Sequence, residues 1–191
     1  MAVGRGRPPK AGRAFGRGRK PPADPASAEA ARGRAISLLS RRDYPRRQLK
    51  ARLEDSGFED RAAESAVAGL EDERLVNDAR YVESAIAGRR ARGQGPLRIA
   101  LELRRAGVPA ALIREALDPR AAEWTERAIE LRRRRFGAAR PATAKERARQ
   151  LRFLLQRGFS ADQVRRALGA GADLELEDLG STAHEADGDA E

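Results

Sequence analysis

The sequence predicts an all-α protein of three tandem three-helix repeats, which form an elongated, curved body between a basic and an acidic disordered tail. A short pattern that returns three times, at a spacing of about fifty residues, is the first observation behind this prediction. The second is the composition, with 40% apolar and 36% charged residues in a chain of 191. So little apolar material suits small repeats that each bury one face better than one large globule.

The recurring pattern is a Leu, a Gly four residues later, an apolar residue directly after the Gly, and an apolar pair nine and ten residues beyond it. The three copies are Leu53, Gly57, Phe58, Ala66 and Val67; Leu103, Gly107, Val108, Ala116 and Leu117; and Leu154, Gly158, Phe159, Ala167 and Leu168. Such a pattern is typical of a helix that ends at Gly, a tight turn, and a further helix with one buried side.

The first repeat is predicted over residues 26–74. Asp24, Pro25 and Ser27 are start signals for its first helix, and Asp43-Tyr44-Pro45 is typical of a turn before the second. The expected buried positions are Ile36, Leu38 and Leu39 in the first helix, Leu49 and Leu53 in the second, and Ala63, Ala66, Val67 and Leu70 in the third.

The second repeat is predicted over residues 75–118. Leu75-Val76-Asn77-Asp78 indicates a helix start, Gly93-Gln94-Gly95-Pro96 a break, and Val108-Pro109 a restart. The expected apolar stripes are Tyr81, Val82, Ala85 and Ile86, then Ile99, Leu103 and Ala106, and finally Leu112, Ile113, Ala116 and Leu117.

The third repeat is predicted over residues 119–170, with a loop at 137–143 and Ser160 as the N-cap of the last helix. The expected stripes are Trp124, Ala128 and Leu131, then Leu151, Leu154 and Leu155, and finally Val164, Ala167 and Leu168. We expect the aromatic residues Trp124, Phe136, Phe153 and Phe159 to pack in the core rather than to stack on bases.

The two tails differ in charge, and both are predicted to be disordered because they hold too few apolar residues to offset their conformational entropy. Residues 1–25 form the basic tail, and residues 171–191 carry eight acids and no Lys or Arg. Arg5-Gly6-Arg7-Pro8 resembles the core of an AT-hook, and Arg17-Gly18-Arg19 begins a degenerate second copy. Arg5, Arg7, Arg17 and Arg19 are therefore candidate DNA contacts, with a nonspecific electrostatic tether as the alternative.

The net charge of +10 favours a polyanionic partner, most simply nucleic acid. Because 35 of the 39 basic residues are Arg, the bias of a GC-rich genome is an alternative explanation. Candidate contact residues for a protein filament or for DNA phosphates are Arg89, Arg90, Arg92, Arg98, Arg104 and Arg105 in the second repeat, and Arg132, Arg133, Arg134 and Arg135 in the third. Four consecutive arginines span most of a helix circumference, so some of them must lie toward packed neighbours.

Several function classes are disfavoured by what the sequence lacks. There is no Cys, and the single His, His184, stands alone in the acidic tail, so we predict no catalytic site, metal or cofactor. No apolar run reaches the length of a membrane span, and the basic N-terminal segment has no apolar core of a signal peptide. The sequence thus favours a cytoplasmic protein that is neither an enzyme nor bound to a membrane.

Residues 75–117 resemble the central repeat of the bacterial RecX regulatory family. The shared elements are Asp78, Arg80 and Tyr81, then Gly93 to Pro96, then Arg98, Ile99, Glu102 and Leu103; residues 145–168 resemble the family's final repeat. The resemblance implies a curved, all-α regulator that lodges in the groove of the RecA filament on DNA and limits filament growth and strand exchange. We expect it to be a non-enzymatic monomer. The resemblance carries over no catalytic residue. A stand-alone architectural or regulatory DNA-binding protein is the alternative, although the Ala-rich third helices have few side chains that read base edges.

Overall fold

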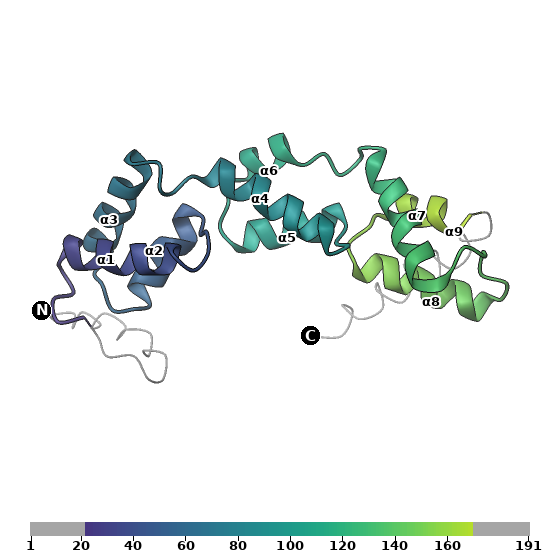
Figure 1. The fold of residues 1–191 in the computed structure, drawn as a ribbon, viewed down its shortest axis with the longest axis horizontal. Helices are drawn as coiled ribbons and strands as arrows, with labels where there is room; N and C mark the ends of the chain where they lie inside the picture. The colour runs from purple at the N-terminus through teal and green to yellow at the C-terminus, as the bar shows by residue number, and fades with distance from the viewer. Residues whose placement is uncertain (1–21, 170–191) are drawn as a thin grey trace, which may run out of the picture. The chain divides into compact units, whose positions relative to one another are not determined.

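The computed structural model describes residues 22–169, and these residues form helices and connecting turns without any β-strand (Figure 1). The helices are α1 (Ala28–Leu39), α2 (Arg46–Glu54), α3 (Asp60–Asp72), α4 (Asp78–Ala91), α5 (Pro96–Arg105), α6 (Ala110–Ala116), α7 (Glu123–Phe136), α8 (Ala144–Gln156) and α9 (Ala161–Leu168). The predicted all-α class and the three successive helix triplets are confirmed. The acidic tail and residues 1–21 of the basic tail lie outside the described residues. The end that we predicted for the basic tail, residue 25, is too late, because the carbonyl of Pro25 accepts from the N–H of Glu59 at 2.9 Å.

The chain divides into two compact units between Asn77 and Asp78. The first unit holds α1 to α3, and the second unit holds the six helices α4 to α9, so that the second and third repeats belong to one body. Each unit has its own hydrophobic cluster, and the cluster of the second unit joins residues of all six helices. The second and third repeats therefore share one core.

The glycines of the recurring pattern have the same role in all three repeats. Gly57, Gly107 and Gly158 each follow the second helix of a repeat with a φ between 86° and 100°, a left-handed conformation that side chains with a Cβ rarely adopt. The residue after each glycine donates a backbone hydrogen bond to the carbonyl of the pattern's leucine, at 3.1–3.3 Å. This pairing is the Schellman motif, which ends a helix and satisfies its last carbonyls.

Apolar contacts complete these turns. The leucines of the pattern, Leu53, Leu103 and Leu154, are fully buried, and the residues that follow the glycines are buried as well. Removing one such leucine side chain from water is worth about 1.5–3 kcal/mol, so each turn is also a core element. Each copy of the recurring pattern thus specifies the same turn between the second and third helices of a repeat.

Side chains cap three helix starts, two of which, at Ser27 and Ser160, were predicted from the sequence. The hydroxyl of Ser27 accepts from the backbone N–H of Ala30 at the start of α1. Ser160 forms a reciprocal capping box with Gln163 at the start of α9, and Thr143 forms one with Glu146 at the start of α8. These caps satisfy N–H groups that have no partner within the helix.

Two expected core positions are wrong. Ile36 is 43% exposed, because α1 buries the stripe Ala31, Ala35 and Leu38 and the next residue along points about 100° away from it. Ala116 is exposed because α6 ends there and the chain continues in an extended conformation at Leu117, which is buried instead.

The prediction that the aromatic residues pack in the core is correct for three of the four. Trp124 and Phe159 are buried in the second unit, as expected. Phe153 is half-buried and packs against the core cluster, whereas Phe136 is half-buried and does not belong to that cluster. The two rings meet edge to face, with centroids 5.3 Å apart.

The second and third repeats meet at two turns whose backbones touch. The N–H of Gly95 donates to the carbonyl of Arg157 at 2.7 Å, and the N–H of Leu97 donates to the carbonyl of Gly158 at 3.0 Å. A Cβ on Gly95 would lie 2.4 Å from the carbonyl carbon of Gly158, and a Cβ on Gly158 would lie 2.3 Å from the Cβ of Arg98. Only glycine fits at both positions.

We expect Gly95→Ala to destabilise the second unit by about 2 kcal/mol or more, because the clash is with backbone that cannot rotate away. Thermal unfolding followed by circular dichroism measures the effect. Gly33→Ala is the matched control: its Cβ would meet nothing within 4 Å on α1, so this change should raise stability by about 0.5–1 kcal/mol. Equal stability of the Gly95→Ala protein and the wild type would contradict the packing described here.

Candidate functional site

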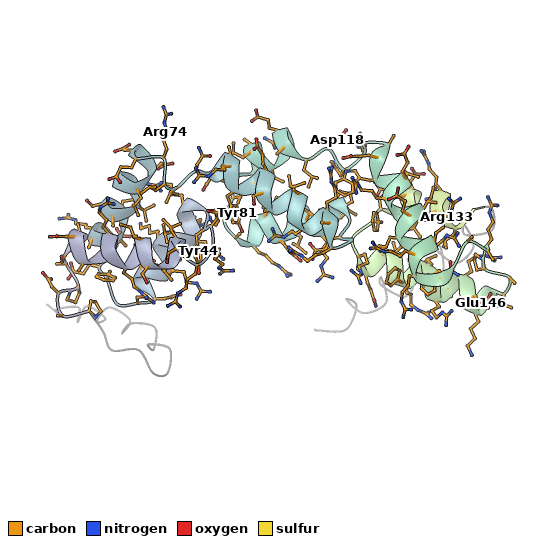
Figure 2. The ribbon with its side chains drawn as sticks, in the orientation of Figure 1. Tyr44, Arg74, Tyr81, Asp118, Arg133 and Glu146 are labelled. Carbon is orange, nitrogen blue, oxygen red and sulfur yellow. The ribbon has the colours of Figure 1, made fainter. Side chains whose placement is uncertain are left out.

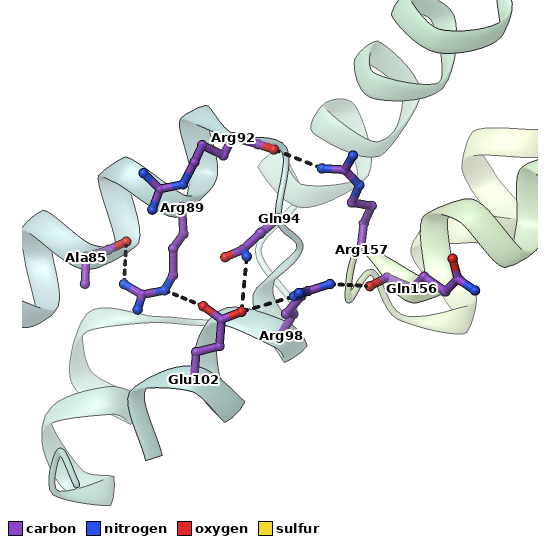
Figure 3. Close-up of polar contacts among 8 residues, drawn as sticks. All are labelled: Ala85, Arg89, Arg92, Gln94, Arg98, Glu102, Gln156 and Arg157. Atoms are coloured by element: carbon purple, nitrogen blue, oxygen red, sulfur yellow. Dashed lines mark hydrogen bonds and ion pairs between the residues drawn. The ribbon is translucent and has the colours of Figure 1, made fainter. Parts of the chain in front are cut away.

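Glu102 on α5 is the centre of a polar network beside the turn that joins α4 and α5 (Figure 3). Its Oε2 accepts from Nε of Arg89 at 2.7 Å, and its Oε1 accepts from Nε of Arg98 at 3.1 Å and from the amide of Gln94 at 3.1 Å. It is the single acidic residue between positions 84 and 114. One carboxylate therefore neutralises part of a basic surface and fixes the turn that carries Gly95.

The network extends to the third repeat through two further arginine contacts. A terminal nitrogen of Arg98 donates to the carbonyl of Gln156 at 3.1 Å, and one of Arg157 donates to the carbonyl of Arg92 at 3.1 Å (Figure 3). These bonds cross the junction from both sides. The arginines thus reinforce the contact between the two glycine turns.

The electrostatics of Glu102 follow from these partners. The hydrogen bond from Arg89 holds the pKa of Glu102 below its ordinary value of 4.5; partial burial opposes this, and the bond from Arg98 adds to it. The carboxylate is charged at neutral pH and stabilises the fold most strongly in that form.

The six predicted contact arginines of the second repeat fall into two groups. Arg89, Arg90 and Arg98 are engaged: Arg89 and Arg98 bind Glu102, and Arg90 forms an exposed ion pair with Glu123 at 3.2 Å. Arg92, Arg104 and Arg105 are exposed, and none of them forms an ion pair with a carboxylate of residues 22–169. The second group offers free guanidinium groups to a partner.

The four consecutive arginines of α7 also separate. Arg132 is 3% exposed, and its guanidinium donates to the carbonyls of Ala139 at 2.8 Å and Ala138 at 3.2 Å. Burial lowers its pKa, and the nearby charges of Arg133 and Arg140 act in the same direction. Arg132 therefore holds the chain after α7, and the expectation that part of this run faces packed neighbours is confirmed.

The other members of the run, Arg133, Arg134 and Arg135, are exposed and make no ion pair within the described part of the chain; Arg133 is labelled on α7 in Figure 2. Of the predicted contact residues, these three and the free group of the second repeat remain available to a ligand. The tail candidates Arg5, Arg7, Arg17 and Arg19, and His184, lie outside the described residues.

Positive charge is concentrated in the second unit. Residues 78–169 carry 22 basic and 10 acidic side chains, whereas residues 22–77 carry 10 basic and 11 acidic ones. In the first unit Arg46 pairs with Glu64 and Glu71, and Lys50 pairs with Asp60 at 2.7 Å. The first unit therefore neutralises its own charges, and the surplus belongs to the second and third repeats.

Sequence reasoning missed the arginines of α8. Arg149 and Arg152 are exposed on one stripe with Phe153, and Arg157 follows the end of the helix. Two features of the sequence could have identified them. Positions 149, 152, 153 and 156 share one face of a helix, and the segment from 131 to 161 holds one acidic residue, Glu146.

Two of the residues that carried the family resemblance serve the structure of α4. Asp78 is the first residue of the helix, and Tyr81 is half-buried against the core cluster of the second unit.

Among residues 22–169, no group of His, Cys, Asp and Glu is arranged to hold a metal ion, and no helix there has the length and apolarity to cross a membrane.

Residues 31–70, 77–117 and 122–168 match the family models for the first, second and third three-helix domains of RecX. The chain belongs to the RecX family. A regulatory role of the RecX type follows from this membership. The residue boundaries that we predicted for the three repeats remain predictions.

Named relatives and solved structures agree with the RecX family models. Over 145 residues the chain is 42% identical to the regulatory protein RecX of Halorhodospira halophila, which covers 76% of this chain and 90% of that protein. It is 39% identical to the RecX of Pseudomonas savastanoi pv. phaseolicola, over 75% of this chain and 94% of that one. The crystal structure of RecX from Lactobacillus salivarius shares the fold, with a TM-score of 0.62 at 20% identity over 80% of this chain and 97% of that chain.

Glu102→Gln tests the polar network by its pH dependence. Because the pKa of Glu102 is lowered in the folded protein, its contribution is present above about pH 4.5 and is lost as the pH falls through the folded value. We expect Glu102→Gln to lower the free energy of unfolding by about 1 kcal/mol at pH 7. Urea unfolding at pH 7 and pH 3 should show a smaller difference between the two proteins at pH 3; an equal difference at both pH values would exclude this linkage.

Arg132→Met keeps the aliphatic part of the side chain and removes the guanidinium. We expect the free energy of unfolding to fall by about 1–3 kcal/mol, since the carbonyls of Ala138 and Ala139 then have no donor. Arg133→Met, at the exposed neighbouring position, should change the free energy of unfolding by less than about 0.5 kcal/mol. Similar values for the two variants in urea unfolding would show that the buried guanidinium is dispensable.

Proposed function

We propose that this RecX-family chain is a non-enzymatic regulator that binds RecA–DNA filaments and inhibits RecA in DNA repair and recombination. The observation that supports it most is the group of exposed arginines in the second unit that lack carboxylate partners: Arg92, Arg104, Arg105, Arg133, Arg134 and Arg135. Guanidinium groups pair with carboxylates on a protein filament and with phosphates of DNA equally well. We further propose that the protein acts as a monomer in the cytoplasm.

The engaged arginines limit which residues would make the contact. Arg89 and Arg98 are bound to Glu102, so their removal would damage the fold before it reported on binding. Arg104 and Arg105, at the end of α5, are exposed and make no such bond. They are the cleaner probe of a filament contact.

The purified protein should lower DNA-dependent ATP hydrolysis by RecA at less than one molecule per RecA. Arg104→Glu/Arg105→Glu should need about tenfold more protein for the same inhibition, which corresponds to about 1.4 kcal/mol. Arg47→Glu/Arg52→Glu is the matched control: both positions are exposed on α2, in the unit that has no positive surplus, and the variant should inhibit like the wild type. No inhibition by the wild type at equimolar protein would remove this function.

A stand-alone DNA-binding protein is the second candidate, and the charge surplus of the second unit favours it. Binding to bare duplex DNA should then fall with salt, with a log–log slope of about −0.9 for each phosphate neutralised. Duplex binding without any effect on RecA would support this candidate over the first one.

A further inference from the structure

The outer side of the α7–α8 pair carries two aromatic rings covered by guanidinium groups. The Phe136 ring has the guanidinium carbons of Arg149 at 5.3 Å and Arg135 at 5.6 Å from its centroid, and the Phe153 ring has that of Arg157 at 5.2 Å. Both rings are half-buried, so part of each is open to solvent between these side chains.

Two neighbouring depressions meet at Phe153 and Gln156. The first, of about 570 Å³, is otherwise lined by Arg135, Phe136, Arg149 and Arg152; the second, of about 460 Å³, is otherwise lined by Arg92, Gln94, Arg98 and Arg157. We call this lining the Phe136–Phe153 surface. It lies entirely within the second unit and runs from the end of α7 across α8 to the junction with the second repeat.

The surface is strongly cationic, and Arg98 is the one arginine of its lining that forms an ion pair within residues 22–169, with Glu102. Residues 131–161 carry ten basic side chains and one acid, Glu146. The carboxylate of Glu146 is occupied by the backbone N–H groups of Ala142, at 2.9 Å, and Thr143. Arg149 and Arg152 make no ion pair within residues 22–169. Like charges so close together favour an anionic ligand that would neutralise them.

We propose that the Phe136–Phe153 surface binds single-stranded DNA, with bases stacked on the two rings and phosphates held by the surrounding arginines. Positive grooves that combine aromatic platforms with backbone contacts are the usual means of binding single strands. In a duplex the base faces are already stacked on one another, so the rings would contribute nothing. An acidic peptide would use the arginines but would have no need of exposed rings.

The guanidinium groups that cover the rings do not prevent this binding. Cation–π contacts at exposed sites are weak, and an arginine can leave a ring for a phosphate while a base takes its place. The site goes beyond the proposed function because it binds a free strand without RecA. The choice of DNA over RNA does rest on that function.

Fluorescence anisotropy of the full chain with a labelled oligodeoxythymidine of about 20 nucleotides tests the proposal without RecA. Phe136→Leu and Phe153→Leu keep every charge and remove the stacking platforms, and each should weaken binding about tenfold. Arg149→Gln/Arg152→Gln should also weaken binding and should make the log–log salt slope shallower by about 0.7 for each phosphate that the variant no longer neutralises. Arg114→Gln/Arg120→Gln, at exposed positions of the same unit, is the charge-matched control and should bind like the wild type.

Phe153 packs against the core cluster and Phe136 does not, so Phe136→Leu keeps the test decisive if Phe153→Leu unfolds. Phenylalanine variants that bind the oligonucleotide like the wild type, while the arginine variant binds weakly, would reduce the site to general electrostatics and overturn the proposal. Tighter binding of duplex DNA, oligouridine or polyglutamate than of oligodeoxythymidine, measured by competition, would also overturn the proposal. Binding of single-stranded DNA without inhibition of RecA would support this inference and remove the proposed function. Inhibition of RecA without binding of single-stranded DNA would support the proposed function and remove this inference.

Discussion

The contact between two turns, one from the second repeat and one from the third, is the constraint on which the second unit depends. Gly95 and Gly158 let their backbones approach until peptide groups bond directly, with no side chain between them. Hydrogen bonds between backbones need a fixed distance and direction, so this junction sets the position of α8 against α5 more narrowly than apolar packing would. The shared core then fills in around it.

Charge in the second unit is arranged around the same junction. Glu102 draws Arg89 and Arg98 inward, and these arginines support the turn that carries Gly95. Arg90 pairs with Glu123 instead, whereas Arg92, Arg104 and Arg105 have no carboxylate partner within residues 22–169 and stay at the surface. Arginines that stabilise the fold and arginines that can bind a ligand therefore lie side by side, and the composition alone does not distinguish the two kinds.

The sequence predicted most of the fold because the decisive signals are local. A left-handed glycine after a leucine, a serine cap and a helical apolar period depend on neighbouring residues, and all were found where expected at Gly57, Gly107, Gly158 and Ser160. Ile36 was misplaced because Ala31 and Ala35 are small enough to form the close contact of α1 with α3, and a small residue gives little hydrophobic signal.

The candidate site was less predictable because it depends on contacts between distant residues. Nothing near Arg132 in sequence marks it as the one buried arginine of its run; the carbonyls of Ala138 and Ala139 return to it only after the chain has turned. The two half-buried phenylalanines resemble core residues in any apolar pattern. They are distinguished only by the packing of α7 against α8.

The N-cap of α2, which corresponds in the repeat to Gly95 at the N-cap of α5, is Pro45. Proline has no N–H to donate and carries a ring where Gly95 has a hydrogen atom. The three modules are therefore alike in their helices but not interchangeable: a chimera in which the first module replaced the second would lack both the donor and the space that the third module requires.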